Sequence, residues 1–108
     1  MNQKEVEEYI LSLPDTRLDY PFGENVAVYK LGDKMFALIS ENKSPLQISL
    51  KCDPELAKFL REKYETVMPG QHLSKKHWNT IVLSGQLAWE EVQALIRHSY
   101  ELVANTSS

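Results

Sequence analysis

Cysteine is almost absent from this sequence, and so are segments that would direct it to a membrane. The one cysteine, Cys52, has no partner for an intrachain disulfide, which agrees with a reducing compartment. No apolar run approaches the roughly 20 residues that span a bilayer, and the N-terminus, Met-Asn-Gln-Lys-Glu, lacks the apolar stretch of a signal peptide. We therefore expect a cytoplasmic protein that has no membrane partner.

Charge of either sign is not in large excess. The formal net charge is −3, but positions 30–80 hold nine Lys or Arg against six Asp or Glu, whereas the rest of the chain holds three against nine. This distribution predicts a mildly basic central surface between acidic ends. Domains dedicated to nucleic acid are often far more basic, so we expect any such binding to be weak and salt-dependent.

Internal repeats, low-complexity tracts and interdomain linkers are missing as well. With 108 residues, 43% of them hydrophobic and 25% charged, the chain is long enough to bury its own core without a metal or a disulfide. We predict one domain over residues 1–104 and a frayed C-terminal tail over residues 105–108.

The first quarter of the chain predicts a helix followed by a loop. Asn2 and the acid three residues later resemble a capping box, and apolar residues recur at helical spacing over 3–13 until a proline stops them. Residues 15–24 contain proline and glycine, which predicts a loop. We expect Tyr20 and Phe22 to anchor this loop to the core.

The middle of the chain predicts strands. Residues 26–31 and 34–40 are strand-like runs joined by Gly32 and Asp33, which favours a hairpin with a type II′ turn. Residues 46–52 alternate strictly between apolar and polar side chains. One face of this strand is therefore expected in the core and the other in water.

The remaining elements complete a mixed fold. Asp53, a helix cap followed by proline and glutamate, opens a helix that is expected to turn Leu56, Phe59 and Leu60 inward. Two short strands and a last helix follow at residues 65–68, 80–83 and 88–103. Together the elements predict an α+β fold, a mostly antiparallel sheet with a helix at each end of the chain and one short inserted helix.

Three segments resemble one family of small bacterial proteins. They are Tyr20-Pro21-Phe22-Gly23, the hairpin over residues 28–37, and residues 72–80, and the match spans nearly the whole chain. These segments resemble the MmcQ/YjbR-like proteins. The resemblance implies a CyaY-like fold, shared with frataxins, in which N- and C-terminal helices pack on one face of an antiparallel sheet. It also implies a double-wing DNA-binding arrangement.

The segment over residues 70–81 has the most unusual composition in the chain. It holds two of the three histidines, two adjacent lysines and one of the two tryptophans. We expect Ser74 to begin a single helical turn, whose exposed N–H groups beside Lys75 and Lys76 suit a phosphate. The alternative is that both lysines are ordinary solvated side chains.

The other chemically versatile side chains favour structural roles. Trp78 either stacks on a base or fills the core at the start of a strand, which is the commoner role. His72 and His77 are five residues apart, whereas zinc-binding helices space histidines by about four, and no nucleophile or acid is tied to them by a known spacing. Cys52 is expected to be a small buried hydrophobe. We predict no catalytic residue, metal or cofactor.

The polar face of the predicted sheet is a second candidate surface. Gln47, Ser49 and Lys51 alternate along one strand, and Lys30 and Lys34 are candidates for neighbouring positions on the hairpin. Scattered cations on such a face fit contact with a DNA backbone, and they fit an ordinary solvated sheet equally well.

The acidic residues of the first helix and the segment after it suggest a different kind of site. They are Glu5, Glu7, Glu8, Asp15 and Asp19. By analogy with frataxins, they would form a metal-handling or protein-interaction surface. An exposed acidic helix face is the commoner explanation, because hard cations need several converging oxygens.

The sequence therefore predicts a non-enzymatic module that binds DNA phosphates weakly through a basic sheet face and the turn before Trp78. The acidic first helix is the alternative site, and a small hydrolase or transferase that uses His72 or His77 is a second alternative. The residues identify no protein partner. The residues assigned to nucleic-acid binding are Lys30, Lys34, Gln47, Ser49, Lys51, His72, Ser74, Lys75, Lys76, His77 and Trp78.

Overall fold

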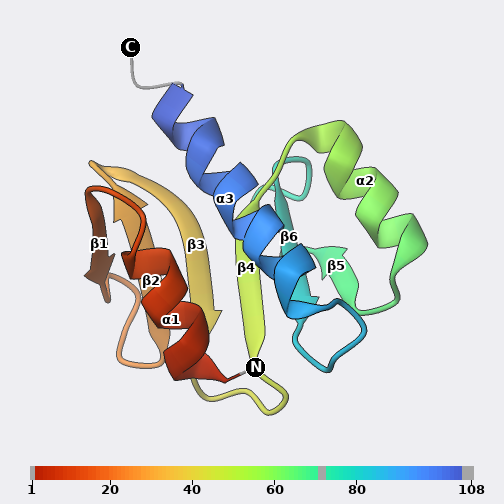
Figure 1. Ribbon diagram of the computed structural model, residues 1–108, viewed down its shortest axis with the longest axis horizontal. Coiled ribbons are helices and arrows are strands. Elements are labelled where there is room, and N and C mark those ends of the chain that lie inside the picture. The colour runs from red at the N-terminus through yellow and green to blue at the C-terminus, as the bar shows by residue number, and fades with distance from the viewer. Residues whose placement is uncertain (1, 71–72, 106–108) are drawn as a thin grey trace.

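The computed structural model describes residues 2–70 and 73–105, which form three helices and six strands (Figure 1). In chain order these are α1 (Gln3–Leu11), β1 (Thr16–Asp19), β2 (Val26–Leu31), β3 (Lys34–Ser40), β4 (Gln47–Lys51), α2 (Pro54–Lys63), β5 (Val67–Pro69), β6 (Trp78–Val82) and α3 (Trp89–Asn105). The predicted α+β class is confirmed.

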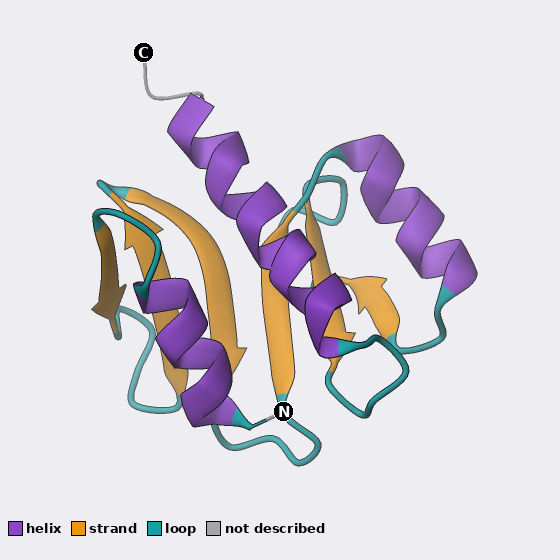
Figure 2. Ribbon diagram, in the orientation of Figure 1, coloured by secondary structure: helices purple, strands orange, loops and turns teal. Residues whose placement is uncertain are grey.

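The strands form one antiparallel sheet in the order β1-β2-β3-β4-β6-β5. Helices α1 and α3 lie across one face of the sheet, which we call the inner face, and α2 lies beside α3 next to β5 and β6 (Figure 2). The opposite face, which we call the outer face, carries no helix of the described residues. The predicted arrangement of terminal helices on one face is confirmed.

The N-terminal helix begins as predicted, but the segment after it differs from the prediction. The Asn2 side chain accepts a hydrogen bond from the Glu5 N–H at 2.9 Å, and α1 ends at Leu11. The chain then turns through Asp15, whose φ of 63° lies in the left-handed region. The predicted loop therefore contains a strand, β1, which pairs with β2 at the edge of the sheet.

Two aromatic side chains follow β1 and remain outside the core. Tyr20 is 41% exposed and Phe22 is 60% exposed, so the prediction that they anchor the loop to the core is wrong. The Tyr20 hydroxyl instead donates to the Glu41 carboxylate at 3.1 Å. A tyrosine whose hydroxyl has a surface partner can keep its ring at the water boundary.

The hairpin of β2 and β3 has the predicted two-residue turn. Leu31 pairs with Lys34, which leaves Gly32 and Asp33 between the strands. Gly32 has a φ of 62°, whereas Asp33 is not in the left-handed region. A positive φ at only the first turn residue is the type II′ pattern.

A β-bulge interrupts the same hairpin at Phe36. Lys30 pairs with Met35 and Tyr29 pairs with Ala37, so β3 has one extra residue. Because of this extra residue, Phe36 and Ala37 both lie in the inner core. The Ser99 hydroxyl of α3 donates a hydrogen bond to the Phe36 carbonyl, which gives the bulged backbone a buried partner.

The inner face carries the main hydrophobic core. Side chains of β2, β3, β4 and β6 pack there against one side of each helix. Its fully buried members include Val6, Ile10, Tyr29, Phe36, Ile39, Ile48, Ile81, Val92, Ile96 and Val103. Burial of this apolar area is the principal source of stability for a domain of this size.

Helix α2 begins at its predicted cap. The Asp53 carboxylate accepts hydrogen bonds from the N–H groups of Glu55 at 3.1 Å and Leu56 at 3.2 Å. Leu60 is buried as predicted, but Phe59 is 54% exposed, so its predicted inward position is wrong. This helix packs beside the edge of the sheet, where only a narrow stripe of its surface is covered.

Helix α3 is held at its start by contacts that the sequence did not reveal. The Ala88 N–H donates to the Glu91 carboxylate at 3.3 Å, and the Trp89 ring packs edge-on against Tyr9 with 5.8 Å between centroids. At its other end α3 extends to Asn105, the first residue of the predicted tail. The remainder of the predicted tail lies outside the described residues.

A second, smaller apolar cluster lies on the outer face. Its members are Val28, Leu38 and Trp78, each at most 8% exposed, with Val26, Met35 and Leu73 packed around them. Neighbouring side chains, rather than a helix, remove this cluster from water. The predicted polar face is therefore interrupted by an apolar cluster from β2, β3 and β6, beside the polar residues of β4.

Candidate functional site

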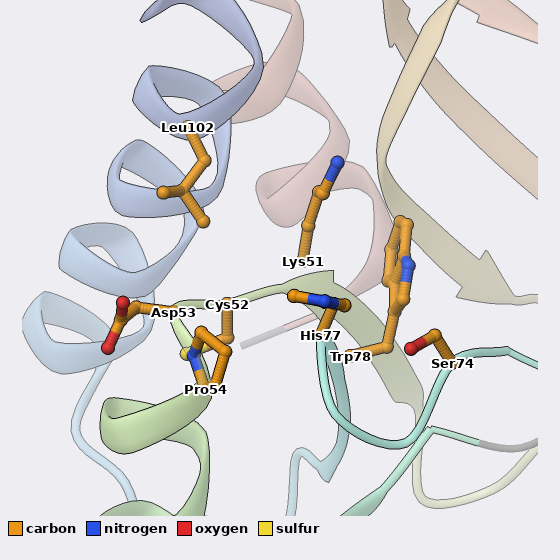
Figure 3. A pocket seen from close by; sticks show the side chains of 8 residues that line it. All are labelled: Lys51, Cys52, Asp53, Pro54, Ser74, His77, Trp78 and Leu102. Carbon is orange, nitrogen blue, oxygen red and sulfur yellow. The ribbon is translucent and has the colours of Figure 1, made fainter. Parts of the chain in front are cut away.

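A cavity of about 500 Å³ lies where β4 ends and β6 begins, and it is open to solvent (Figure 3). We call it the β4–β6 cavity. The end of β4, the start of α2, the turn before β6 and the C-terminal half of α3 form its walls. Its lining residues are Lys51, Cys52, Asp53, Pro54, Ser74, His77, Trp78 and Leu102. Four residues that the sequence assigned to nucleic acid thus share one cavity.

Backbone hydrogen bonds hold the turn before β6 against the end of β4. The Cys52 N–H donates to the His77 carbonyl at 2.7 Å, and the His77 N–H donates to the Ser74 carbonyl at 3.2 Å. The second bond closes a single turn that does not extend into a helix. Lys51 and Trp78 are paired across the two strands, which sets their side chains beside each other on the outer face.

Gly70 allows β5 to approach the cavity wall closely. Its N–H donates to the Trp78 carbonyl at 2.9 Å. A Cβ atom at this position would lie 2.7 Å from the Trp78 Cβ, which is closer than two carbon atoms can pack. Any larger residue at Gly70 would therefore displace the backbone of β6 and move Trp78.

One lysine lines the cavity, and two more belong to the turn beside it. Lys51 is half-buried, and Lys75 and Lys76 are exposed on the adjoining turn. None of the three forms an ion pair within residues 2–70 and 73–105. The carboxylate in the lining, that of Asp53, caps α2, and Figure 3 shows it turned away from His77. The rim is therefore suited to an anion.

Trp78 forms one wall of the cavity, but little of its ring is available. It is 7% exposed, because most of the ring packs in the outer-face cluster with Val28 and Leu38. The prediction that Trp78 fills the core at the start of a strand is therefore confirmed. Stacking on a nucleic-acid base would require this cluster to open.

The cysteine beside the cavity is not an active nucleophile. Cys52 is 4% exposed and belongs to the inner core, and burial raises the pKa of its thiol to about 11. The thiol therefore stays protonated at neutral pH, whereas nucleophilic chemistry needs the thiolate. The prediction of a small buried hydrophobe is confirmed.

The predicted lysines of the hairpin do not join the cavity. Lys30 forms an ion pair with Asp19 on the outer face, with 3.1 Å between Nζ and the carboxylate oxygen. This lysine holds the pKa of the Asp19 carboxyl below its usual value. Lys34 pairs with Leu31, the neighbour of Lys30, so Lys34 and Lys30 point to opposite faces of the sheet. Their predicted grouping is wrong.

The remaining predicted residues also lie away from the cavity. The hydroxyls of Ser49 and Thr80 share a hydrogen bond of 2.8 Å in the middle of the outer face. Gln47 pairs with Val82 at the opposite end of β4 from the cavity. His72 lies outside the described residues. The structure therefore concentrates the candidate site at one end of the sheet.

Two of the acidic residues proposed as the alternative site are engaged elsewhere. The Glu7 carboxylate accepts a hydrogen bond from the buried Tyr29 hydroxyl at 2.7 Å, and Asp19 bonds to Lys30. Across the described part of the chain, no three His, Cys, Asp or Glu side chains gather as ligands for a metal ion. No observation favours a metal site on α1 over the cavity.

Sequence reasoning missed part of the cavity wall. Asp53 and Pro54 were predicted only as the start of a helix, and Leu102 lies in α3, about 50 residues from β4 in the chain. The spacing of apolar residues changes after residue 52 from strict alternation to helical spacing, which marks the end of a strand and the start of a helix. This change was a usable signal for this part of the cavity wall. Nothing in the local sequence links Leu102 to this position.

Comparisons with known proteins agree with this fold. The YjbR family model matches residues 11–102. The uncharacterised protein YjbR of Escherichia coli is 31% identical over 105 residues, which cover 97% of this chain and 89% of that protein. The uncharacterised protein YbdF of Escherichia coli O157:H7 is 35% identical over 95 residues, which cover 88% and 78%.

Two crystal structures are also similar. The Deinococcus radiodurans protein DR2400, which has a DUF419 domain, superposes with a TM-score of 0.90 at 34% identity, covering 97% of this chain and 80% of that chain. A protein from Pseudomonas syringae superposes with a TM-score of 0.80 at 32% identity, covering 94% and 98%. None of the helices described here is long and apolar enough to cross a bilayer. The sequence match and the shared fold together show that this chain belongs to the YjbR family.

Proposed function

We propose that this chain is a non-enzymatic module that binds the phosphate groups of DNA at the β4–β6 cavity and the adjoining turn. The observation that carries the proposal is the meeting of Lys51, Ser74 and His77 around one opening, beside Lys75 and Lys76. Phosphate oxygens accept hydrogen bonds from hydroxyl and imidazole groups and are attracted to ammonium groups.

The difference between the cavity lysines and the hairpin lysine supports this location. Lys30 is already neutralised by Asp19, whereas Lys51 has no carboxylate partner in the described chain. A half-buried ammonium group is also screened less by salt than a fully exposed one. An incoming phosphate would therefore gain more at the cavity than at the hairpin.

The proposal contains no bond-breaking step. The Cys52 thiol is held protonated by burial, with its pKa raised to about 11, so we assign no nucleophile. A cytoplasmic role agrees with the proposal, because DNA is reached there in a bacterium and a lone buried cysteine needs no oxidising environment.

The proposal is tested by titrating the protein into a fluorescently labelled DNA duplex at two salt concentrations. Binding is expected with a Kd on the order of 10⁻⁴ to 10⁻⁶ M at physiological salt. If three lysines neutralise three phosphates, the slope of log K against log salt is expected to be about −2.7. Absence of binding, or binding that does not respond to salt, would contradict the proposal.

A matched pair of variants locates the site. Lys75→Glu combined with Lys76→Glu is expected to weaken binding at least about tenfold and to lower the salt slope by about 2. The control combines Lys4→Glu with Lys43→Glu, which makes the same charge change on exposed residues of α1 and of the loop before β4. Equal losses from both pairs would show that net charge, rather than the cavity, determines binding.

A further inference from the structure

Strand β1 forms an open edge of the sheet (Figure 1). It pairs with β2 on one side, and no strand of the described residues pairs with its other side. Its central apolar residue, Leu18, is 37% exposed, and Tyr20 and Phe22 just beyond it are more exposed still. An open edge with exposed apolar residues is a template for pairing with another strand.

The direction of the backbone groups at this edge follows from the hairpin. Leu31 and Lys34 flank a two-residue turn, so the backbone groups of Leu31 point toward β3 and not toward β1. Thr16, which pairs with Leu31, therefore points its own N–H and C=O away from β2, and its N–H bonds back to the Leu13 carbonyl at 3.4 Å. By alternation, the N–H and C=O of Leu18 also point to the open edge.

The charges on either side of Leu18 are opposite in sign. Arg17 and Asp19 both lie on the outer face, because they pair with Lys30 and Val28. Arg17 faces the like charge of Lys30 across the strands and has no ion-pair partner in residues 2–70 and 73–105. Its guanidinium donates one hydrogen bond to the Gly32 carbonyl at 3.0 Å, which leaves further N–H donors unused.

We propose that β1 pairs antiparallel with β1 of a second copy of this chain, about a two-fold axis at Leu18. In this register each Leu18 exchanges two backbone hydrogen bonds with its counterpart. Arg17 of each copy lies opposite Asp19 of the other, whose carboxylate would then be shared between Arg17 and Lys30. The edge is therefore complementary to itself in both hydrogen bonding and charge. A parallel pairing would set like charges opposite each other and lacks this complementarity.

The size of the contact sets its strength. A four-residue strand and the aromatic side chains next to it form a small interface, below the roughly 1,200 Å² of stable complexes. The dimer is therefore transient, with a Kd on the order of 10⁻⁴ M. The β4–β6 cavity lies on the other side of the sheet's centre, so pairing at β1 leaves it open.

Charge exchange between two variants tests the register. Arg17→Asp gives a chain with two acids flanking Leu18, and Asp19→Arg gives a chain with two bases. Each variant alone sets like charges opposite each other, and its self-association is expected to weaken about tenfold or more. A mixture of the two restores both opposite-charge pairs and is expected to associate within about threefold of the unmodified chain.

Sedimentation velocity between about 10 μM and about 1 mM measures association of each chain and of the mixture. Circular dichroism confirms that each variant is folded. Hydrogen exchange of the Leu18 amide in the unmodified chain is expected to slow as concentration rises. A chain that stays monomeric throughout this range overturns the proposal, and so does a mixture that associates no better than its two components.

A backbone variant gives an independent test. Leu18→Pro removes the N–H that points to the open edge, a position where an edge strand tolerates proline. Self-association is expected to be lost while the circular dichroism spectrum is kept. If the variant does not fold, the charge-exchange mixture and the Leu18 amide still decide the question. Association of a folded Leu18→Pro chain at the unmodified strength would overturn the proposal.

Discussion

The inner and outer faces of the sheet are both partly removed from water, but by different means. On the inner face, Ile39, Ile48 and Ile81 form a continuous apolar row beneath the helices. On the outer face, the row that begins at Leu38 becomes polar at Ser49 and Thr80. Helices protect one face, whereas neighbouring side chains and the turn before β6 protect the other.

This difference explains where the candidate site lies. The cavity opens at one end of the sheet, where Pro54 and Leu102 of the helices meet Trp78 of the outer-face cluster. The apolar cluster ends at Trp78, and Lys51 lies beside it. We therefore expect substitutions on the inner face to change stability most, and substitutions at the outer rim to change binding most.

The largest effect on the free energy of unfolding is expected when two adjacent residues of β3, which point to opposite faces, are each replaced by alanine. Ile39→Ala is expected to lower the free energy of unfolding by about 4 kcal/mol, because it leaves a cavity beneath the helices. Leu38→Ala is expected to cost about 2 kcal/mol, because side chains at the surface can close part of the space. Urea unfolding of both variants measures the two losses. Equal losses would show that the two faces are equally rigid.

The next effect concerns Cys52, an inner-face residue next to the outer-face Lys51. Because burial raises its pKa from 9.0 to about 11, its thiolate fraction near pH 8 is expected to be about 100-fold below that of an unfolded chain. Reaction with a thiol reagent should be slower in the native protein by this factor than in urea. Equal rates would mean that the thiol opens to the cavity.

The same shift in pKa predicts how stability depends on alkaline pH. Between pH 9.0 and about 11 the folded chain keeps the Cys52 proton, whereas the unfolded chain releases it. The unfolded state then binds fewer protons, so the free energy of unfolding is expected to fall as pH rises through this window. Urea unfolding of Cys52→Ala provides the control, because it should lose the Cys52 part of this dependence and keep the part that comes from Tyr29, whose pKa burial also raises.

A smaller effect on the free energy of unfolding is expected at two tyrosines whose hydroxyls donate hydrogen bonds to glutamates. Tyr29→Phe removes a part-buried hydrogen bond to Glu7 and is expected to lower the free energy of unfolding by about 1.5 to 2 kcal/mol. Tyr20→Phe removes a bond to Glu41 at the surface and is expected to change it by less than about 0.5 kcal/mol. Thermal unfolding of the two variants tests this order, and a reversal would contradict it.

The smallest effect is expected at the Asp19–Lys30 ion pair, since exposed pairs contribute little. Lys30 lowers the pKa of the Asp19 carboxyl, so its contribution is present above the unfolded value of 3.8 and is lost as pH falls. Asp19→Asn is therefore expected to shift the urea midpoint slightly at pH 7 and not at all in strong acid. A large shift at pH 7 would mean that the outer face depends on this pair.

Elements with strong local signals were predictable from the sequence. The β2–β3 hairpin has a turn that only a few residue types adopt, and α2 has a cap followed by proline. Strand β1 was missed because its four residues, Thr-Arg-Leu-Asp, show little apolar character and are stabilised by pairing with β2. Phe59 was misplaced because the helical pattern does not reveal how much of a helix is covered.

Only part of the candidate site could be predicted from the sequence, again because only local signals are visible there. The composition of residues 70–81 marked Ser74, Lys75, Lys76 and His77 without any structure. Lys51 joined them because β4 lies next to β6, and Lys34 was excluded because it pairs with Leu31. The position of Lys51 depends on strand pairing between residues that are distant in the chain, whereas the position of Lys34 follows from the two-residue turn at Gly32 and Asp33.

The amino-acid sequence alone determined the class of fold, most of its helices and strands, and the family resemblance. These follow from periodicity, capping and turn chemistry, which act over a few residues. Only the tertiary structure decided which lysines share a cavity, which are neutralised, and which edge stays open. Those outcomes depend on how distant segments bury their apolar surfaces together, and no local pattern records that choice.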